Sequence, residues 1–155
     1  MSTPGSVGDY AACIGTTGYD VPVNLKVNNV EFSLPPNGAF VQEPGLRTPD
    51  FKDGLSNTLL VGEKFIPRGQ ELKQPYDCNL YDGHNIICST RCAGPGLPLA
   101  QALDDPRLLF GGPHVGICQF VFVDGSVHPV RTSIDEIALG LLSDRDDGLP
   151  TPTDY

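Results

Sequence analysis

The sequence lacks the features that would place it in a membrane or on a nucleic acid. No run of about 18 or more apolar residues occurs, so no segment is long enough to cross a bilayer as a helix. Ten Lys and Arg residues stand against 19 Asp and Glu residues, which gives a formal net charge of -9 at pH 7. Binding to nucleic acid or to an anionic lipid surface needs a positive patch. We therefore expect no nucleic-acid partner and no membrane insertion by this chain.

The short motifs of common enzyme classes are also missing. The chain contains no Gly-x-Ser-x-Gly, no phosphate-binding loop and no Gly-x-Gly-x-x-Gly, so serine hydrolase, nucleotide and dinucleotide functions have no sequence support. Cys88 and Cys92 are four positions apart, but no second Cys or His pair follows in the spacing of a zinc finger. The first residues show no basic region followed by an apolar one, as a signal peptide would.

What the chain does contain is glycine and proline, 18 and 15 of its 155 residues. This composition favours loops, turns and short strands over long helices. The length fits one domain with a real core, so we expect a single domain over 1–155, frayed at 1–8 and 144–155. The five cysteines favour disulfides formed in an oxidising compartment, with the connectivity open. The alternative is a set of reduced, buried cysteines in a cytosolic protein.

Hydrophobic periodicity predicts several strands. Residues 21–27 and 30–34 alternate with period two, and Asn28-Asn29 between them is typical of a hairpin turn. Residues 58–65 carry consecutive apolar residues, which predicts a central strand buried on both faces. Short helical turns are expected at 50–54 and 100–103. Residues 67–113 are otherwise irregular, and a stretch of that length favours disulfide ties or a functional insertion.

The clearest pattern is a hairpin over residues 117–130. A β-prone apolar run is followed by Asp124-Gly125, the pair that a two-residue turn with two positive φ angles prefers. The outgoing strand should lie at a sheet edge, because Pro129 has no N–H for a ladder. This register puts Cys118, Phe120, Phe122, Val127 and Arg131 on one face, and Gln119, Val121, Val123, Ser126 and His128 on the other.

A short helix is predicted after the hairpin. Ser133 and Glu136 have the spacing of a capping box at its start. The apolar stripe expected to pack on the sheet consists of Ile134, Ile137, Ala138, Leu141 and Leu142.

Two segments together resemble one protein family. The first is residues 53–64 (DGLSNTLLVGEK). The second is residues 110–114 (FGGPH), followed after nine residues by Asp124-Gly125-Ser126-Val127 and then by Ile134-Asp135. This pairing resembles the planctomycete-rich family of prepilin-type, pseudopilin-like proteins of unknown function, which is recognised by a histidine, nine residues and an Asp-Gly pair.

The resemblance implies the fold of the globular head of type IV pilins and type II secretion pseudopilins. That fold is α+β and mainly antiparallel β, with long irregular loops and a short C-terminal helix. The resemblance also implies an extracellular or envelope location and protein partners from a pilus or secretion system, and it leaves the oligomeric state open. Family members usually begin with a prepilin leader and a long apolar helix, and this sequence shows neither. We therefore expect a head that does not assemble filaments by itself.

His114 is the first candidate for a functional residue. The strand predicted after it would separate it from Asp124 by about 30 Å at ~3.3 Å per residue, so the two side chains should not form a pair. We expect His114 to order its loop through hydrogen bonds. Asp124-Gly125 and Asp53-Gly54 are predicted to act as structural turn residues.

A metal site and a cysteine nucleophile are the alternatives. No cofactor is predicted from a recognised motif, but Asp82, His84, His114 and His128 supply ligand types that suit zinc or another divalent metal. Cys118 lies four residues from His114, and Cys92 follows Arg91, a cation that can lower a thiol pKa. The competing prediction is that both cysteines are core thiols or disulfide partners. Glu63 and Lys64 are expected to meet solvent at a strand end and to form at best a weak surface ion pair, and a buried Glu63 is the alternative.

Three hypotheses for function follow. The first is an extracellular or envelope structural or interaction domain without catalysis. The second is a small metal-dependent hydrolase for ester or phosphoester bonds, with His114, His84 and Cys118 as catalytic candidates. The third is an extracellular module that binds carbohydrate or another small ligand.

Overall fold

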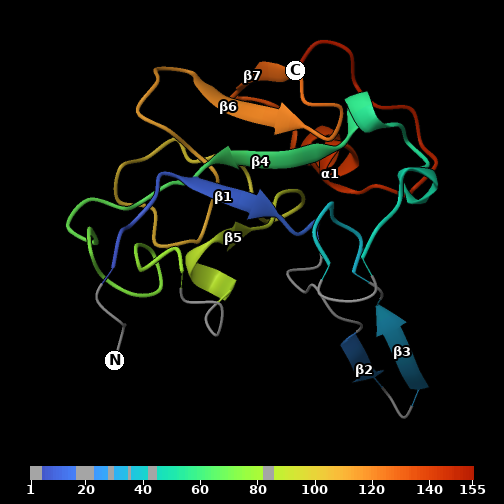
Figure 1. The fold of residues 1–155 in the computed structure, drawn as a ribbon, viewed down its shortest axis with the longest axis horizontal. Coiled ribbons are helices and arrows are strands. Elements are labelled where there is room, and N and C mark those ends of the chain that lie inside the picture. Colours follow the sequence, from blue (N-terminus) through green and yellow to red (C-terminus); the bar gives the residue numbers. More distant parts are fainter. Residues whose placement is uncertain (1–4, 17–22, 28–29, 35, 42–44, 82–85) are drawn as a thin grey trace.

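A computed structural model of the chain describes residues 5–16, 23–27, 30–34, 36–41, 45–81 and 86–155. The fold is α+β, as predicted, with a mostly antiparallel sheet and a short helix near the C-terminus (Figure 1). The sheet has the order β5-β1-β4-β6-β7, in which β1 and β5 pair in parallel and the other neighbours are antiparallel. Its strands are β1 (Tyr10–Cys13), β4 (Leu59–Glu63), β5 (Thr90–Arg91), β6 (Ile117–Phe122) and β7 (Val127–Arg131). Within the described ranges, no helix is long and apolar enough to cross a membrane.

The predictions for the first half of the chain are largely confirmed. β4 is the central strand of the sheet. β2 (Val23–Val27) and β3 (Val30–Leu34) form a separate antiparallel hairpin, and the predicted Asn28-Asn29 turn lies outside the described residues. Short 3-10 turns occur at η1 (Thr48–Asp50), η2 (Leu55–Asn57) and η3 (Ile86–Cys88). The helical turn predicted at 100–103 is wrong, because the Ala100 N–H donates to the Phe110 carbonyl (2.9 Å) and holds that segment alongside residue 110.

The turn between β6 and β7 has three residues rather than the predicted two. The Gly125 N–H donates to the Phe122 carbonyl (2.9 Å), and the Phe122 N–H donates to the Ser126 carbonyl (2.9 Å). Val123, Asp124 and Gly125 therefore form the loop. Gly125 has a φ of 86°, the left-handed conformation that the last position of such a loop requires.

The longer loop changes which side chains of β7 face the core. Val121 pairs with Val127, and Val130 pairs with Cys118. Because a slip of one residue turns every side chain to the other face, the predicted grouping was wrong for the outgoing strand. Val130 is fully buried, whereas Val127 is 62% exposed. The edge position predicted for β7 from Pro129 is confirmed.

The helix α1 (Glu136–Ser143) begins two residues later than a Ser133 cap would place it. Asp135 is the N-cap, and its Oδ1 accepts hydrogen bonds from the N–H groups of Ile137 (2.9 Å) and Ala138 (3.2 Å). The predicted capping box is wrong because the chain at Ser133 is still in a turn after β7. The Glu136 carboxylate instead accepts a hydrogen bond from the Gly96 N–H (2.6 Å).

The buried face of the helix differs from the predicted apolar stripe. Leu139 and Leu142 are fully buried, and they belong to the core together with Phe110, Phe120 and Phe122. Ile137, which was predicted in the stripe, is 67% exposed.

The acidic tail, for which the sequence predicts fraying, is tied to the domain at several places, among them Asp53 and Phe122. The Asp53 carboxylate accepts hydrogen bonds from the N–H groups of Asp147 (3.0 Å) and Gly148 (2.8 Å). The Tyr155 ring stacks on Phe122, with 5.5 Å between the ring centroids.

Candidate functional site

The two segments that carry the family resemblance meet at Glu63. This residue ends β4, and only 6% of its surface is exposed. Its Oε2 accepts a hydrogen bond from the Gln119 N–H (2.7 Å), and its Oε1 lies 3.2 Å from Nε2 of His114. Its carbonyl accepts from the Gly111 N–H (2.9 Å). One residue therefore connects β4, β6 and the loop 111–116.

The local geometry explains why a carboxylate stands at this position. The ladder between β4 and β6 ends at the pair Gly62–Phe120. The Gln119 N–H points toward β4 just beyond that pair, and the Glu63 carboxylate supplies the missing acceptor. Gly112 leaves the necessary room, because a Cβ at this position would collide with the Glu63 carboxylate.

A shallow groove runs beside this site. Two cavities of about 430 and 450 Å³ share four lining residues, Phe65, Leu103, Gly112 and Pro113. Asp9 and Glu63 line the first cavity, and His114 lines the second. The imidazole is half exposed, and the carboxylate beside it already accepts a hydrogen bond from the Gln119 N–H. Glu63 and His114 therefore form an internal structural contact at the wall of the groove.

Lys64 points away from Glu63 into a second buried cluster. Its side chain is fully buried, and Nζ lies 3.4 Å from both Asp77 Oδ1 and the Cys88 carbonyl. The predicted surface ion pair between Glu63 and Lys64 is therefore wrong, because successive residues of a strand face opposite sides and both sides are covered here. Arg91, only 2% exposed, donates from Nη1 to the Ile87 carbonyl (2.7 Å) and completes this cluster.

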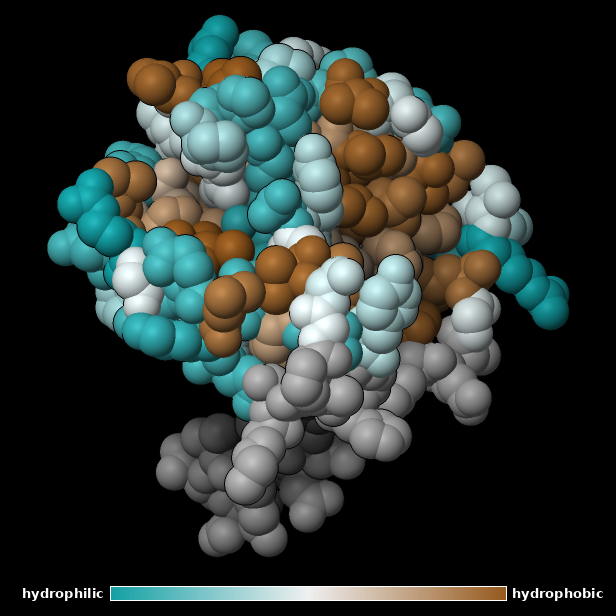
Figure 2. All heavy atoms as spheres, turned by 60° about the vertical axis from the view of Figure 1, so that its left-hand side comes forward, coloured by the Kyte–Doolittle hydropathy of each residue, from teal (hydrophilic) through white to brown (hydrophobic). Residues whose placement is uncertain are grey.

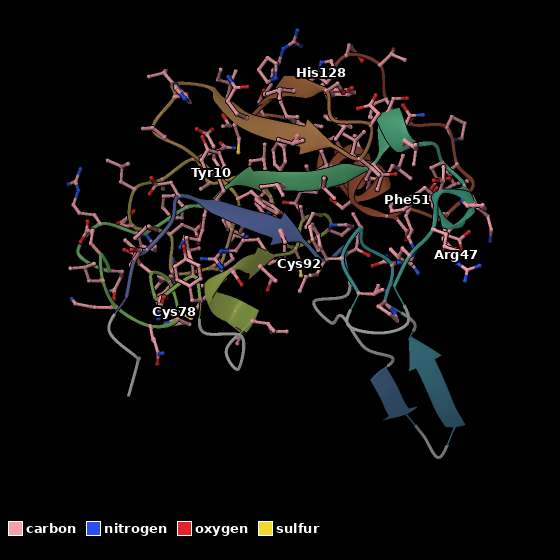
Figure 3. The ribbon with its side chains drawn as sticks, viewed as in Figure 1. Tyr10, Arg47, Phe51, Cys78, Cys92 and His128 are labelled. Atoms are coloured by element: carbon pink, nitrogen blue, oxygen red, sulfur yellow. A yellow bond between two sulfur atoms is a disulfide. The ribbon has the colours of Figure 1, made fainter. Side chains whose placement is uncertain are left out.

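The disulfide and the burial of the remaining thiols favour structural roles for the cysteines over nucleophilic ones. Cys78 and Cys88 form a disulfide beside η3, and Figure 3 shows Cys78 in this region. The Cys118 thiol is fully buried, and burial raises its pKa. Burial likewise raises the pKa of Cys13 to about 11. A thiol with a raised pKa is a poor nucleophile at neutral pH. Cys92 is also buried, at 8% exposure.

The candidate metal ligands do not gather in the described residues. His114 contacts Glu63, whereas the His128 ring lies 3.0 Å from the Ser126 Oγ and packs edge-on against Phe122. Figure 3 shows His128 on β7, far from the disulfide region. Across the described ranges, no group of three or more His, Cys, Asp or Glu side chains could hold a metal ion. Asp82 and His84 lie outside the described residues.

The predicted turn residues make local contacts. Asp124 Oδ1 accepts hydrogen bonds from the Ser126 N–H (2.8 Å) and Oγ (2.6 Å). These bonds lower the pKa of the Asp124 carboxyl. The Gly54 carbonyl accepts from the Thr58 hydroxyl (3.1 Å), and Asp53 holds the tail as described above. His114 and Asp124 lie at opposite ends of β6.

Sequence reasoning missed the buried roles of Glu63, Lys64 and Arg91. The available signal was the position of Glu63 at the end of the central strand, within one resemblance segment, and the Gly111-Gly112 pair in the other. Glycines at a strand end often mark a close approach of another group.

These features define a small α+β domain in which the polar side chains around the central strand are engaged in internal contacts. Residues 7–93, more than half of the chain, match the family described as "Protein of unknown function (DUF1559)", and the chain belongs to this family. No curated protein and no solved structure matches the chain.

Proposed function

We propose that this chain is a pseudopilin-like structural or interaction domain that acts in the cell envelope or outside the cell, without catalysis of its own. Its partners would be proteins of a pilus or secretion system. The Cys78–Cys88 disulfide supports an oxidising compartment. The contacts of Glu63 and the buried thiols support a structural role for the groups that could otherwise perform chemistry.

The observation that carries the proposal is the sheet face opposite the core. Ala12, Val61, Val121 and Val127 are successive cross-strand neighbours, so they form one apolar row over β1, β4, β6 and β7. Val127 is 62% exposed, and Tyr10 beside this row is 59% exposed. Figure 2 shows a broad apolar area on its right-hand side. The rotation between the two views moves the front of Figure 1 to this side. An apolar surface of this kind on a protein of high net charge is typical of an interaction site.

Photocrosslinking in cells tests the proposal. A benzophenone amino acid is placed at position 127, on the apolar row, or at position 137 on α1. Ile137 is a matched control, because its 67% exposure is close to the 62% of Val127. We expect position 127 to give a discrete adduct with an envelope or secreted protein, and position 137 to give little. The substitution Val61→Asp, in the middle of the row, should abolish the adduct. Equal yields from both positions, or adducts with cytosolic proteins alone, would contradict the proposal.

A further inference from the structure

The Lys64 amine is enclosed by a side chain next to one cysteine of the disulfide and by the carbonyl of the other. Lys64 Nζ lies 3.4 Å from Asp77 Oδ1, and Asp77 directly precedes Cys78. The second acceptor, also at 3.4 Å, is the carbonyl of Cys88 itself. Both acceptors are therefore positioned by the Cys78–Cys88 bond, which closes ten positions of sequence. The backbone of Lys64 is fixed separately, because its main-chain N–H donates to the Asp9 carbonyl (2.7 Å) at the end of the sheet.

The same two chain segments enclose a second cation. Arg91 donates from Nη1 to the carbonyls of Ile87 and Thr90 (2.7 Å each) and from Nη2 to the Tyr76 carbonyl (3.1 Å). Its Nε has no hydrogen-bond partner among the described residues. Tyr76 and Ile87 each lie within two residues of one of the disulfide cysteines.

The enclosure buries two cations. Both interact with the Asp77 carboxylate, and Lys64 also interacts with the Asp9 carboxylate. Burial lowers the pKa of Lys64, and the neighbouring Arg91 lowers it further. Burial also lowers the pKa of Arg91 to about 10. Two buried cations repel each other and lose hydration, so the enclosure needs a constraint that holds its walls together. η3 has only three residues and cannot supply that constraint by itself.

We propose that the Cys78–Cys88 disulfide is a redox-sensitive lock that keeps the Lys64 side chain buried, and that its reduction releases the Lys64 amine to solvent while the sheet stays folded. A dithiol supplies the two electrons. The S–S bond breaks, each cysteine gains a hydrogen, and the dithiol closes to its own disulfide. Asp77 and the Cys88 carbonyl are then free to separate. Lys64 stays next to the end of β4. Its long, flexible side chain can then place the charged amine in water.

Quantitative acetylation followed by peptide mass spectrometry tests this lock. The native protein is treated with an acetylating reagent before and after incubation with dithiothreitol, and each lysine is scored separately. The internal control is Lys52, whose side chain is 65% exposed. We expect the Lys64 acetylation rate to rise at least about tenfold on reduction, because removal of a short loop constraint makes local opening easier. The Lys52 rate should not change.

A double variant and a fold measurement make the outcome decisive. The Cys78→Ser/Cys88→Ser protein should acetylate at Lys64 without reductant as fast as the reduced wild type, whereas Cys13→Ser, which removes a buried thiol elsewhere, should keep Lys64 protected. Amide hydrogen exchange in β4 and β6 should stay slow in every sample. Continued protection of Lys64 with both thiols shown to be free overturns the proposal. A rise that accompanies fast exchange throughout β6 also overturns it, because the disulfide would then support the whole fold.

Discussion

Replacement of Glu63 by alanine should destabilise the domain by about 2–3 kcal/mol. The substitution removes the charged acceptor of the Gln119 N–H, which lies 2.7 Å from Glu63 Oε2 in a partly buried position. An unsatisfied buried donor costs about 1–3 kcal/mol, and a hydrogen bond to a charged group contributes about 1.5–3 kcal/mol. The two values describe the same lost interaction, so they are not added together. The contact with His114 adds less than about 1 kcal/mol, because the imidazole is half exposed and solvent screens the pair.

Urea denaturation of the oxidised protein measures this effect, and two further variants separate its parts. Glu63→Gln keeps an acceptor for the Gln119 N–H and should lose roughly half as much stability as Glu63→Ala. His114→Ala should lose less than about 1 kcal/mol. The expected order of stability is therefore His114→Ala, then Glu63→Gln, then Glu63→Ala. A Glu63→Ala protein within about 0.5 kcal/mol of wild type would refute the reasoning, as would a larger loss for His114→Ala than for Glu63→Ala.

Three other predictions concern the helix, the hairpin and the buried thiols. Asp135→Ala should lower the unfolding free energy by about 1 kcal/mol through loss of the N-cap, whereas Ser133→Ala should leave it unchanged, and equal effects in thermal melts would contradict the observed cap. Gly125→Ala should cost about 1 kcal/mol in the same assay, because Gly125 has a φ of 86° that alanine adopts poorly; a neutral effect would contradict the turn geometry. Burial raises the pKa of Cys13 from 9.0 to about 11 in the folded state, so the buried neutral thiol contributes stability that is fully present below pH 9.0 and is lost as the pH rises toward 11. Denaturation between pH 8 and pH 11 (about the range set by these two pKa values) should show a shallower loss of stability for Cys13→Ala than for wild type, and an identical slope would contradict the assignment.

The elements that sequence reasoning located correctly are those with a strong local signal. The alternation in residues 21–27 and 30–34 predicted two strands, and the apolar runs of β4 and β6 predicted one strand each; all four strands are present. Pro129 correctly predicted an edge strand because a missing N–H is a local property. These patterns, with the short terminal helix, agree with the α+β class that the family resemblance implied.

The errors occurred where the same short stretch of sequence suits two alternative local structures. Asp124-Gly125 suits a two-residue turn, but it also suits a three-residue loop with glycine last, and the choice determines which face Val127 occupies. Ser133 and Asp135 are both good helix caps, and the turn after β7 decides between them.

The candidate site was harder to predict because it is built from long-range contacts. Glu63 binds the Gln119 N–H across 56 positions of sequence, and Lys64 binds the Cys88 carbonyl across 24. Their neighbours in sequence give no indication of either partner. The predicted surface pair between Glu63 and Lys64 was wrong for this reason.

The oxidation state of Cys78 and Cys88 inside cells tests the central claim most directly. Cells that produce the protein from its own gene are quenched with acid, and the unfolded proteins are alkylated with a mass-tagged maleimide before and after reduction. The account predicts that Cys78 and Cys88 stay unlabelled until reductant is added, because the proposed function requires an oxidising envelope or extracellular setting, in which their disulfide persists. Full labelling of both cysteines before reduction would contradict that setting, and with it the proposed function.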